Sequence, residues 1–173
     1  MTHLNVEIKA RTSRPVAIRQ VLEKHEARFV GIDHQIDTYY KVANGRLKLR
    51  QGNIEKTLIH YRRPDQAGPK TSTVTLYYPQ EDASLKQVLE NALEVLVVVD
   101  KQRAIYFIDN VKFHVDEVKG LGSFVEIEAI DMDGSIGRAR LQEQCNDYLR
   151  LLDIKTEDLV EKSYSDLIMA SLK

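Results

Sequence analysis

Acidic and basic side chains occupy alternate positions near the start of the chain. In the segment Asn5-Val6-Glu7-Ile8-Lys9-Ala10-Arg11, an acid and two bases alternate with apolar residues. Because alternate residues of a β-strand point to the same face, this segment predicts a strand with one charged and one apolar face. Other segments repeat the pattern, and their charged positions are Arg46, Lys48 and Arg50, then Lys101 and Arg103, then Lys112, His114 and Asp116, and finally Glu126 and Glu128.

A run of cations on one strand face needs an anion beside it. Like charges that face each other across a strand pair destabilise a sheet, so the run Arg46, Lys48 and Arg50 indicates an anionic ligand. A triphosphate is such a ligand, because Arg and Lys donors can hold its oxygens at fixed positions. Grouped carboxylates suit Mg²⁺ or Mn²⁺, which prefer oxygen ligands and bridge to phosphates. The chain has no Gly-rich phosphate loop, so side chains must hold the phosphates.

Each charged strand, taken singly, has a simpler interpretation as a half-buried strand with a solvated, salt-bridged face. Taken together, the cation-rich faces favour an inward orientation, into a wet cavity whose apolar outer surface is covered by helices. The predicted anion-binding residues are Lys9, Arg11, Arg46, Lys48, Arg50, Arg63, Lys70, Lys101 and Arg103. The predicted acids of the cavity are Glu7, Asp116, Glu126 and Glu128.

Period-two alternation predicts eight strands joined mainly by short turns. These strands span residues 3–11, 28–41, 45–51, 54–63, 70–79, 95–108, 111–118 and 122–131. Helical spacing of apolar residues predicts helices at residues 15–28, 82–93, 135–151 and 156–172. Short connections favour pairing of consecutive strands, and closing the strands into a barrel removes exposed sheet edges. We therefore predict an α+β fold in which helices flank an eight-stranded antiparallel β-barrel; an open sheet covered on one side by helices is the alternative.

The composition is that of an ordinary globular protein. Its 173 residues suit a single domain, 1–173, and the net charge of −1 provides no overall basic field for nucleic acid or an anionic membrane. The lone Cys145 excludes an intrachain disulfide, and the first residues show no signal-peptide pattern. No apolar run is long enough to span a bilayer. We expect a cytoplasmic protein that binds neither nucleic acid nor membrane.

The ordered set of motifs resembles the CYTH superfamily, the triphosphate tunnel metalloenzymes, and most closely its class IV adenylate cyclase branch. The family's E-x-E-x-K strand is matched by Asn5-Val6-Glu7-Ile8-Lys9. The resemblance covers nearly the whole chain, and the further matching segments are 37–40, 45–50, 61–64, 101–106, 114–122, 124–128 and 162–167.

This resemblance implies an eight-stranded tunnel that binds a small triphosphate together with Mg²⁺ or Mn²⁺. It assigns metal binding to Glu7, Asp116, Glu126 and Glu128, and phosphate binding to the lysines and arginines named above. Among these, it places Glu7, Lys9 and Arg63 at the reacting centre. It implies an adenylate cyclase that converts ATP to cyclic AMP and pyrophosphate, with a homodimer as the expected assembly.

Two other functions remain open at this point. One is a triphosphatase that hydrolyses tripolyphosphate, thiamine triphosphate or a nucleoside triphosphate, and the other is a protein that binds polyphosphate without turnover. The first acid of the E-x-E-x-K motif is Asn5 in this chain. Its carbonyl can still ligate a metal, but it brings no charge and cannot act as a base.

Overall fold

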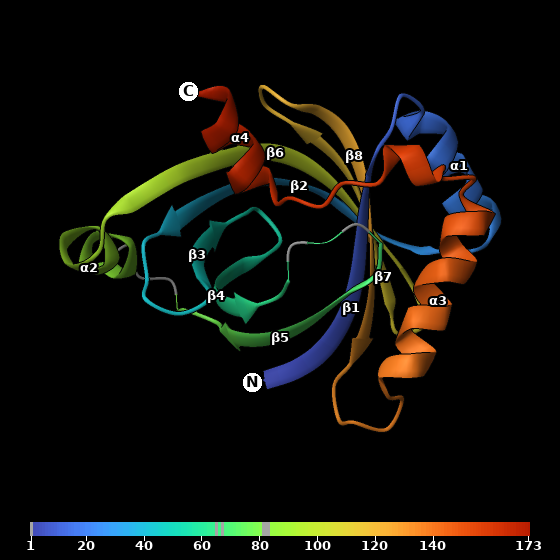
Figure 1. The fold of residues 1–173 in the computed structure, drawn as a ribbon, viewed down its shortest axis with the longest axis horizontal. Helices are drawn as coiled ribbons and strands as arrows, with labels where there is room; N and C mark the ends of the chain where they lie inside the picture. Colours follow the sequence, from blue (N-terminus) through green and yellow to red (C-terminus); the bar gives the residue numbers. More distant parts are fainter. Residues whose placement is uncertain (1, 65, 67, 81–83) are drawn as a thin grey trace.

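Eight antiparallel strands close into a barrel in the computed structural model, which describes residues 2–64, 66, 68–80 and 84–173 (Figure 1). The strands are β1 (Thr2–Arg11), β2 (Arg28–Tyr40), β3 (Arg46–Gln51), β4 (Lys56–Arg62), β5 (Lys70–Tyr77), β6 (Val95–Ile108), β7 (Val111–Val118) and β8 (Gly122–Asp131). The helices are α1 (Pro15–Lys24), α2 (Ser84–Ala92), α3 (Arg138–Leu151) and α4 (Tyr164–Ser171), with a 3₁₀ turn at Thr156–Asp158. The predicted α+β barrel with flanking helices is confirmed.

The order of strands around the barrel is β1-β5-β4-β3-β2-β6-β7-β8. Two runs, β2 to β5 and β6 to β8, pair consecutively as the short turns predicted. The two helical connections, which the short-turn argument does not cover, join strands that are not neighbours: β1 pairs with β5 and β8, whereas β2 pairs with β6. Helices α1 and α2 each carry the chain far enough for the next strand to join elsewhere. Strand β1 therefore lies between the two runs and closes the barrel.

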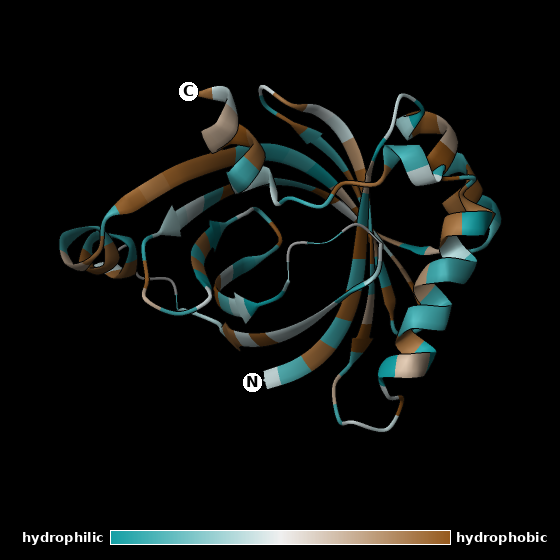
Figure 2. Cartoon of the chain, viewed as in Figure 1, coloured by the Kyte–Doolittle hydropathy of each residue, from teal (hydrophilic) through white to brown (hydrophobic). Residues whose placement is uncertain are grey.

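The apolar faces of β1, β7 and β8 point outward and are covered by helices. Val6 and Ile8 of β1 pack in one cluster with Leu22 of α1 and with Leu141 and Cys145 of α3, and all five are buried. Figure 2 shows the alternation of hydrophilic and hydrophobic residues along β1 that produces this arrangement. Since the apolar face of these strands is used outside, their charged face is left for the lumen.

Helix α4 closes one end of the barrel. It packs through Tyr164 against Phe124 of β8 and against Val99 of β6. Its first turn is fixed by a capping box in which Ser163 and Asp166 exchange hydrogen bonds, so the helix begins at Tyr164 and not at residue 156 as predicted. Among the described residues, no helix combines the length and apolar character required to cross a membrane.

The packing of α3 on β1 gives a direct test of the fold. The side chain of Leu141 is completely buried, so Leu141→Ala should lower the free energy of unfolding by about 2–5 kcal/mol through lost burial and a cavity. Urea unfolding followed by circular dichroism measures this. Leu172→Ala is the control, because Leu172 is 77% exposed and should lose under about 0.5 kcal/mol. Equal effects of the two changes would contradict the assigned core.

Candidate active site in the barrel lumen

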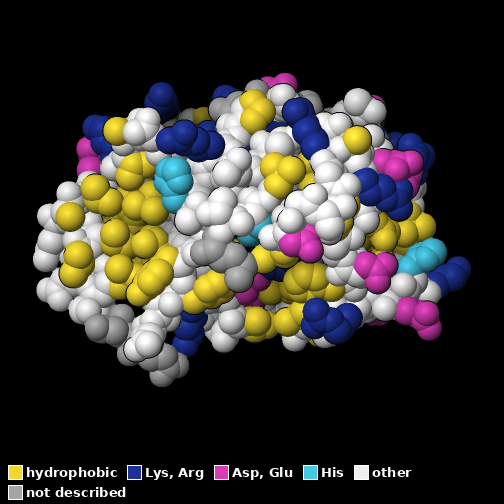
Figure 3. Space-filling model, turned by 90° about the horizontal axis from the view of Figure 1, so that it is seen from below, with side chains coloured by type: hydrophobic (Ala, Val, Ile, Leu, Met, Phe, Trp, Pro, Cys, Tyr) yellow, Lys and Arg dark blue, Asp and Glu magenta, His cyan; other side chains and the backbone are white. Residues whose placement is uncertain are grey.

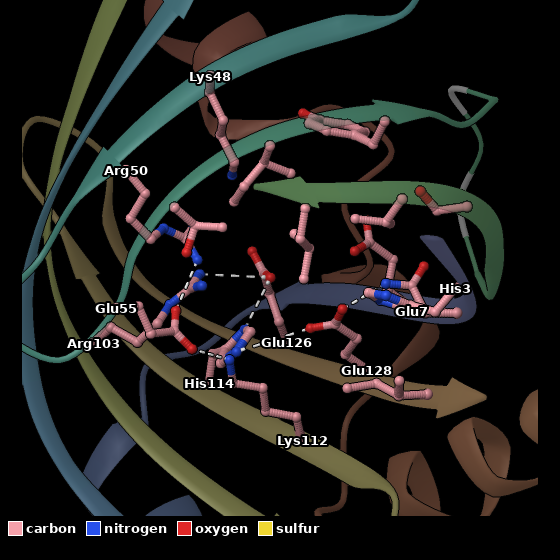
Figure 4. Close-up of a pocket in the computed structure, with 18 of the residues that line it drawn as sticks. His3, Glu7, Lys48, Arg50, Glu55, Arg103, Lys112, His114, Glu126 and Glu128 are labelled. Carbon is pink, nitrogen blue, oxygen red and sulfur yellow. Dashed lines mark hydrogen bonds and ion pairs between the residues drawn. The ribbon is translucent and has the colours of Figure 1, made fainter. Parts of the chain in front are cut away.

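The barrel encloses a cavity of about 630 Å³ that we call the tunnel. Within the described part of the chain, every strand except β2 and β5 contributes a Lys, Arg, His or Glu side chain to its lining, and Figure 4 shows many of these side chains pointing toward one another. The predicted site residues in the lining are Glu7, Lys9, Lys48, Arg50, Arg63, Lys101, Arg103, Glu126 and Glu128. The structure therefore brings together most of the residues selected from alternation.

The tunnel is open at one end and closed at the other. At the open end the lining includes Ile54, Tyr78 and Met132, whose exposed fractions are 42%, 61% and 52%. At the closed end it includes Ser163 and Tyr164 at the start of α4, both buried. In Figure 3, charged side chains are visible in a hollow among hydrophobic ones. A ligand would enter past an apolar rim and reach a charged interior.

Two arginines are fixed inside the tunnel by buried aspartates. Arg50 donates through Nε and Nη2 to the two carboxylate oxygens of Asp37, at 2.9 Å each. Arg103 binds Asp116 in the same side-on manner, at 2.7 and 2.6 Å. Burial alone would raise the pKa of Asp37, but Arg50 and the nearby lysines hold it well below its usual range. Each guanidinium is thereby locked in one orientation, with nitrogen donors left for a ligand.

Asp116 lies behind the tunnel lining and holds Arg103 in place. Arg103 donates to both of its carboxylate oxygens, and the hydroxyl of Tyr164 donates to Oδ2 at 2.7 Å. Its exposed fraction is 1%. In this structure Asp116 positions Arg103, and its predicted role as a metal ligand stays a prediction.

Two lysines lie deep in the tunnel. Lys101 donates to Asp37 at 2.8 Å, and Lys9 lies 3.4 Å from Glu126 with its ammonium 3.9 Å from the centre of the Tyr164 ring. Burial, opposed by Asp37, lowers the pKa of Lys101 to about 7. Burial likewise lowers the pKa of Lys9, against the effect of Glu126. Both amines are desolvated, which disfavours their charged forms, and a bound anion would stabilise those charged forms.

Three glutamates of the lining lie on two adjacent strands. Glu7 on β1 faces Glu128 on β8 in the strand register, and Glu126 lies two residues from Glu128. Glu7 pairs with Arg63, and Glu128 accepts a hydrogen bond from the Asn5 amide. Burial would raise the pKa of Glu126, but Lys9 and Arg103 hold it well below its usual range. Glu126 is therefore ionised at neutral pH.

The donor chemistry beside Glu128 fits a divalent cation. Carboxylate and amide oxygens are the ligands that Mg²⁺ and Mn²⁺ prefer. Within the described part of the chain, Asn5 Oδ1 and His114 Nε2 are buried without a hydrogen-bond partner. His114 Nδ1 lies 3.3 Å from Glu126, and Nε2 lies 4.0 Å from Glu128. Over the same described residues, no three His, Cys, Asp or Glu side chains already form a metal cluster. A cation there would draw these donors closer together.

Three predicted phosphate ligands lie outside the tunnel lining. Arg11 is exposed and donates to the Leu121 carbonyl at 3.2 Å, because it lies at the end of β1 beyond the closed end. Arg46 donates to Ser163 and Asp166 and so anchors α4. Lys70 is buried and donates to the carbonyl of Glu161. The segment around α4 thus binds Arg46 and Lys70, a contact that strand periodicity cannot predict.

The lining also includes Lys112, His114 and Glu55, which were not among the predicted ligands. Lys112 and His114 follow the same alternation as Asp116, but nothing in the local pattern assigns them to the ligand. Glu55 precedes β4 in a turn, where alternation does not fix the direction of a side chain. It accepts hydrogen bonds from Arg50 at 2.9 Å and from Lys112. Only the tertiary structure identifies Glu55 as a lining residue, because its partners Arg50 and Lys112 lie on different strands.

The lowered pKa of Lys101 predicts a pH dependence of stability. Between pH 7 and the ordinary lysine value, the unfolded chain holds a proton on Lys101 that the folded chain has released, so folding becomes more favourable as pH rises. Relative to Lys101→Met, the wild-type free energy of unfolding should rise by about 2 kcal/mol from pH 7 to pH 9. Urea titrations at each pH measure the difference, and a constant difference would contradict the assignment.

Structures of similar fold come from distant organisms. The PH1012 protein from Pyrococcus horikoshii superposes with a TM-score of 0.77 at 24% identity, over 94% of this chain and 98% of that one. A candidate adenylate cyclase from Vibrio parahaemolyticus gives 0.74 at 19% identity, over 95% and 97%. A candidate adenylyl cyclase from Hippeastrum, described as having a dominant triphosphatase activity, gives 0.59 at 13% identity, over 99% and 96%.

The family assignment rests on the sequence itself. No curated protein shows significant sequence similarity to the chain. The CYTH domain model, in contrast, matches residues 3–164, nearly the whole length, and that span contains every residue of the tunnel lining. The chain belongs to the CYTH domain family, whose members act on triphosphates.

Proposed function

We propose that the chain is a metal-dependent enzyme that cleaves the phosphate chain of a triphosphate bound in the tunnel. The main support for this proposal is the excess of lysine and arginine side chains in a cavity that is closed at one end. Among the lining residues that the structure describes, eight are lysine or arginine and four are glutamate, and the buried Asp37 and Asp116 behind the two arginines bring the acids to six. The remaining excess of cations in a largely desolvated cavity favours a polyanionic ligand.

In this proposal the basic residues of the tunnel bind phosphate and its glutamates bind the metal. Arg103 and Lys101 present fixed donors to phosphate oxygens, and Arg63 and Lys9 lie beside the carboxylates. Glu7, Glu126 and Glu128 would hold Mg²⁺ or Mn²⁺, with the Asn5 carbonyl as a further oxygen. When bound, the metal supplies charge neutralisation at the phosphate oxygens and activates the attacking oxygen. Positioning and neutralisation are the main demands of phosphoryl chemistry.

For the reaction itself, we propose adenylate cyclisation, in which the 3′-oxygen of ATP attacks the α-phosphorus and pyrophosphate leaves. The apolar rim with Ile54, Phe107 and Met132 beside a charged interior offers a place for a nucleoside outside the phosphate site. Hydrolysis is the second candidate, because the charged interior accommodates a bare tripolyphosphate equally well. Proteins with this fold carry both activity names, so fold alone does not choose between them.

A single assay separates these reactions. The protein is incubated with ATP, and separately with tripolyphosphate, in the presence of Mg²⁺ or Mn²⁺. Cyclic AMP with pyrophosphate is the expected product from ATP. Orthophosphate without cyclic AMP would replace cyclisation by hydrolysis, and binding without turnover would leave a polyphosphate-binding protein.

Glu126→Gln tests the assignment of Glu126 to metal binding. The change keeps the size of the side chain but removes a charge that faces Lys9 and the metal site. Turnover should fall by a factor of about 100 or more, because charge stabilisation at the reacting centre is lost. Steady-state rates at saturating metal measure it, and circular dichroism verifies the fold.

The matched control is Glu157→Gln, at an exposed position in the 3₁₀ turn, which should keep the wild-type rate. Wild-type turnover in a folded Glu126→Gln protein would remove Glu126 from the mechanism.

A further inference from the structure

An ion pair lies in the lumen near the open end of the tunnel. Glu55 belongs to the turn between β3 and β4, and its carboxylate pairs with Lys112 of β7. The turn rests on β2, whose Gln35 donates to the Glu55 carboxylate, and in the closed order of strands only β6 separates β2 from β7. The ion pair therefore bridges the turn and β7 across the inner face of β6 (Figure 4).

The turn that carries Glu55 is held by hydrogen bonds to a buried carboxylate on β2. Asp33 of β2 is fully buried and accepts hydrogen bonds from the backbone amides of Ile54 and Glu55, at 2.8 and 3.0 Å. Gln35, also fully buried, donates to Asp33 at 2.8 Å and to Glu55 at 3.0 Å. A Cβ at Gly52 would lie 2.6 Å from Asp33 Oδ1, so only glycine allows this approach. The Glu55 backbone is held in place and cannot easily swing away.

Strand register places this pair on the side of the open end. Lys112 faces Glu128, whereas His114 faces Glu126 two residues nearer the closed end. Ile54, next to Glu55, is part of the exposed rim. Along β7, Asp116, which binds Arg103, lies four residues nearer the closed end than Lys112, and Lys9 faces Glu126 at the level of His114. Arg103 and Lys9 are thus held by residues that lie deeper along β7 and β8 than the Lys112 partner of Glu55.

We infer that Glu55 is a specificity-determining residue that sets the outer limit of the phosphate site. This inference rests on the proposed function, in which the deep cations bind a triphosphate. A phosphate chain that fills the interior ends near Glu55. Every further phosphate must lie beside a carboxylate that the turn prevents from moving. The tunnel therefore accepts a triphosphate and disfavours longer linear polyphosphates.

A simple counterion role for Glu55 makes a different prediction. As a counterion it would compete with any phosphate for Arg50 and Lys112, and its removal would strengthen the binding of short and long chains alike. As an outer limit, its removal helps the longer chain more. The ratio of two dissociation constants separates the two roles, whereas either constant alone does not.

The experiment compares tripolyphosphate with linear tetrapolyphosphate by isothermal titration calorimetry, without divalent metal and at one ionic strength. Wild type should prefer tripolyphosphate. Glu55→Gln should reduce that preference by about ten-fold or more, since a unit charge a few ångströms away contributes over about 1 kcal/mol even when screened. Lys112→Gln, which removes one of the two cations paired with Glu55 and leaves Arg50, should increase the preference. Glu117→Gln, at an exposed position on β7, is the matched control and should match wild type.

Each possible result supports or refutes the role of Glu55 as the outer limit. An unchanged ratio in a folded Glu55→Gln protein that still binds tripolyphosphate would overturn the role of Glu55 and leave the proposed function intact. If binding requires Mg²⁺, the same ratio is compared with Mg²⁺ present. Failure of wild type to bind either polyphosphate both without and with Mg²⁺ would instead overturn the proposed function and this inference with it. If Glu55→Gln does not fold, an unchanged or reduced preference in Lys112→Gln still refutes the proposal.

Discussion

The tunnel depends on two guanidinium groups that are each held side-on by a buried aspartate. Asp37 lies behind Arg50 and Asp116 behind Arg103, and each aspartate is almost fully withdrawn from solvent. Removing one partner of such a pair leaves an uncompensated charge, which costs about 3–5 kcal/mol. The pairs therefore fix the direction in which each arginine faces the lumen, and Lys101 and Tyr164 are bound to the same two carboxylates.

The barrel makes this arrangement possible by separating two environments. Outside, α1 and α3 bury the apolar faces of β1, β7 and β8 in one continuous core. Inside, every charged residue can find a partner on a neighbouring or opposite wall. Where the C-terminal segment reaches the barrel, Arg46 and Lys70 hold it and α4 closes the end. Stability is thus provided outside the barrel, while the lumen keeps a cation surplus that favours an anionic ligand.

The sequence predicted the strands and the inward face well, because period-two alternation depends only on local geometry. Alternation placed Glu7, Lys9, Arg50 and Glu126 on the charged strand faces, and the concentration of cations on those faces indicated that they point into the lumen. Alternation could not show how far along the wall the lumen extends, so Arg11 was assigned to a site that ends before it. It also could not show that Asp116 faces Arg103, since that pairing depends on the register between β6 and β7. The Glu55 turn depends on Asp33 across the sheet, which no local pattern reveals.

A crystal structure with tripolyphosphate and Mg²⁺ would show whether the lumen binds the phosphate chain. We expect phosphate density inside the barrel, within hydrogen-bond distance of Arg103, Lys101 and Lys9, and a metal ion beside Glu126 and Glu128. Phosphate bound only on the outer surface, for example near Arg11 and Arg14, with an empty lumen, would contradict this expectation.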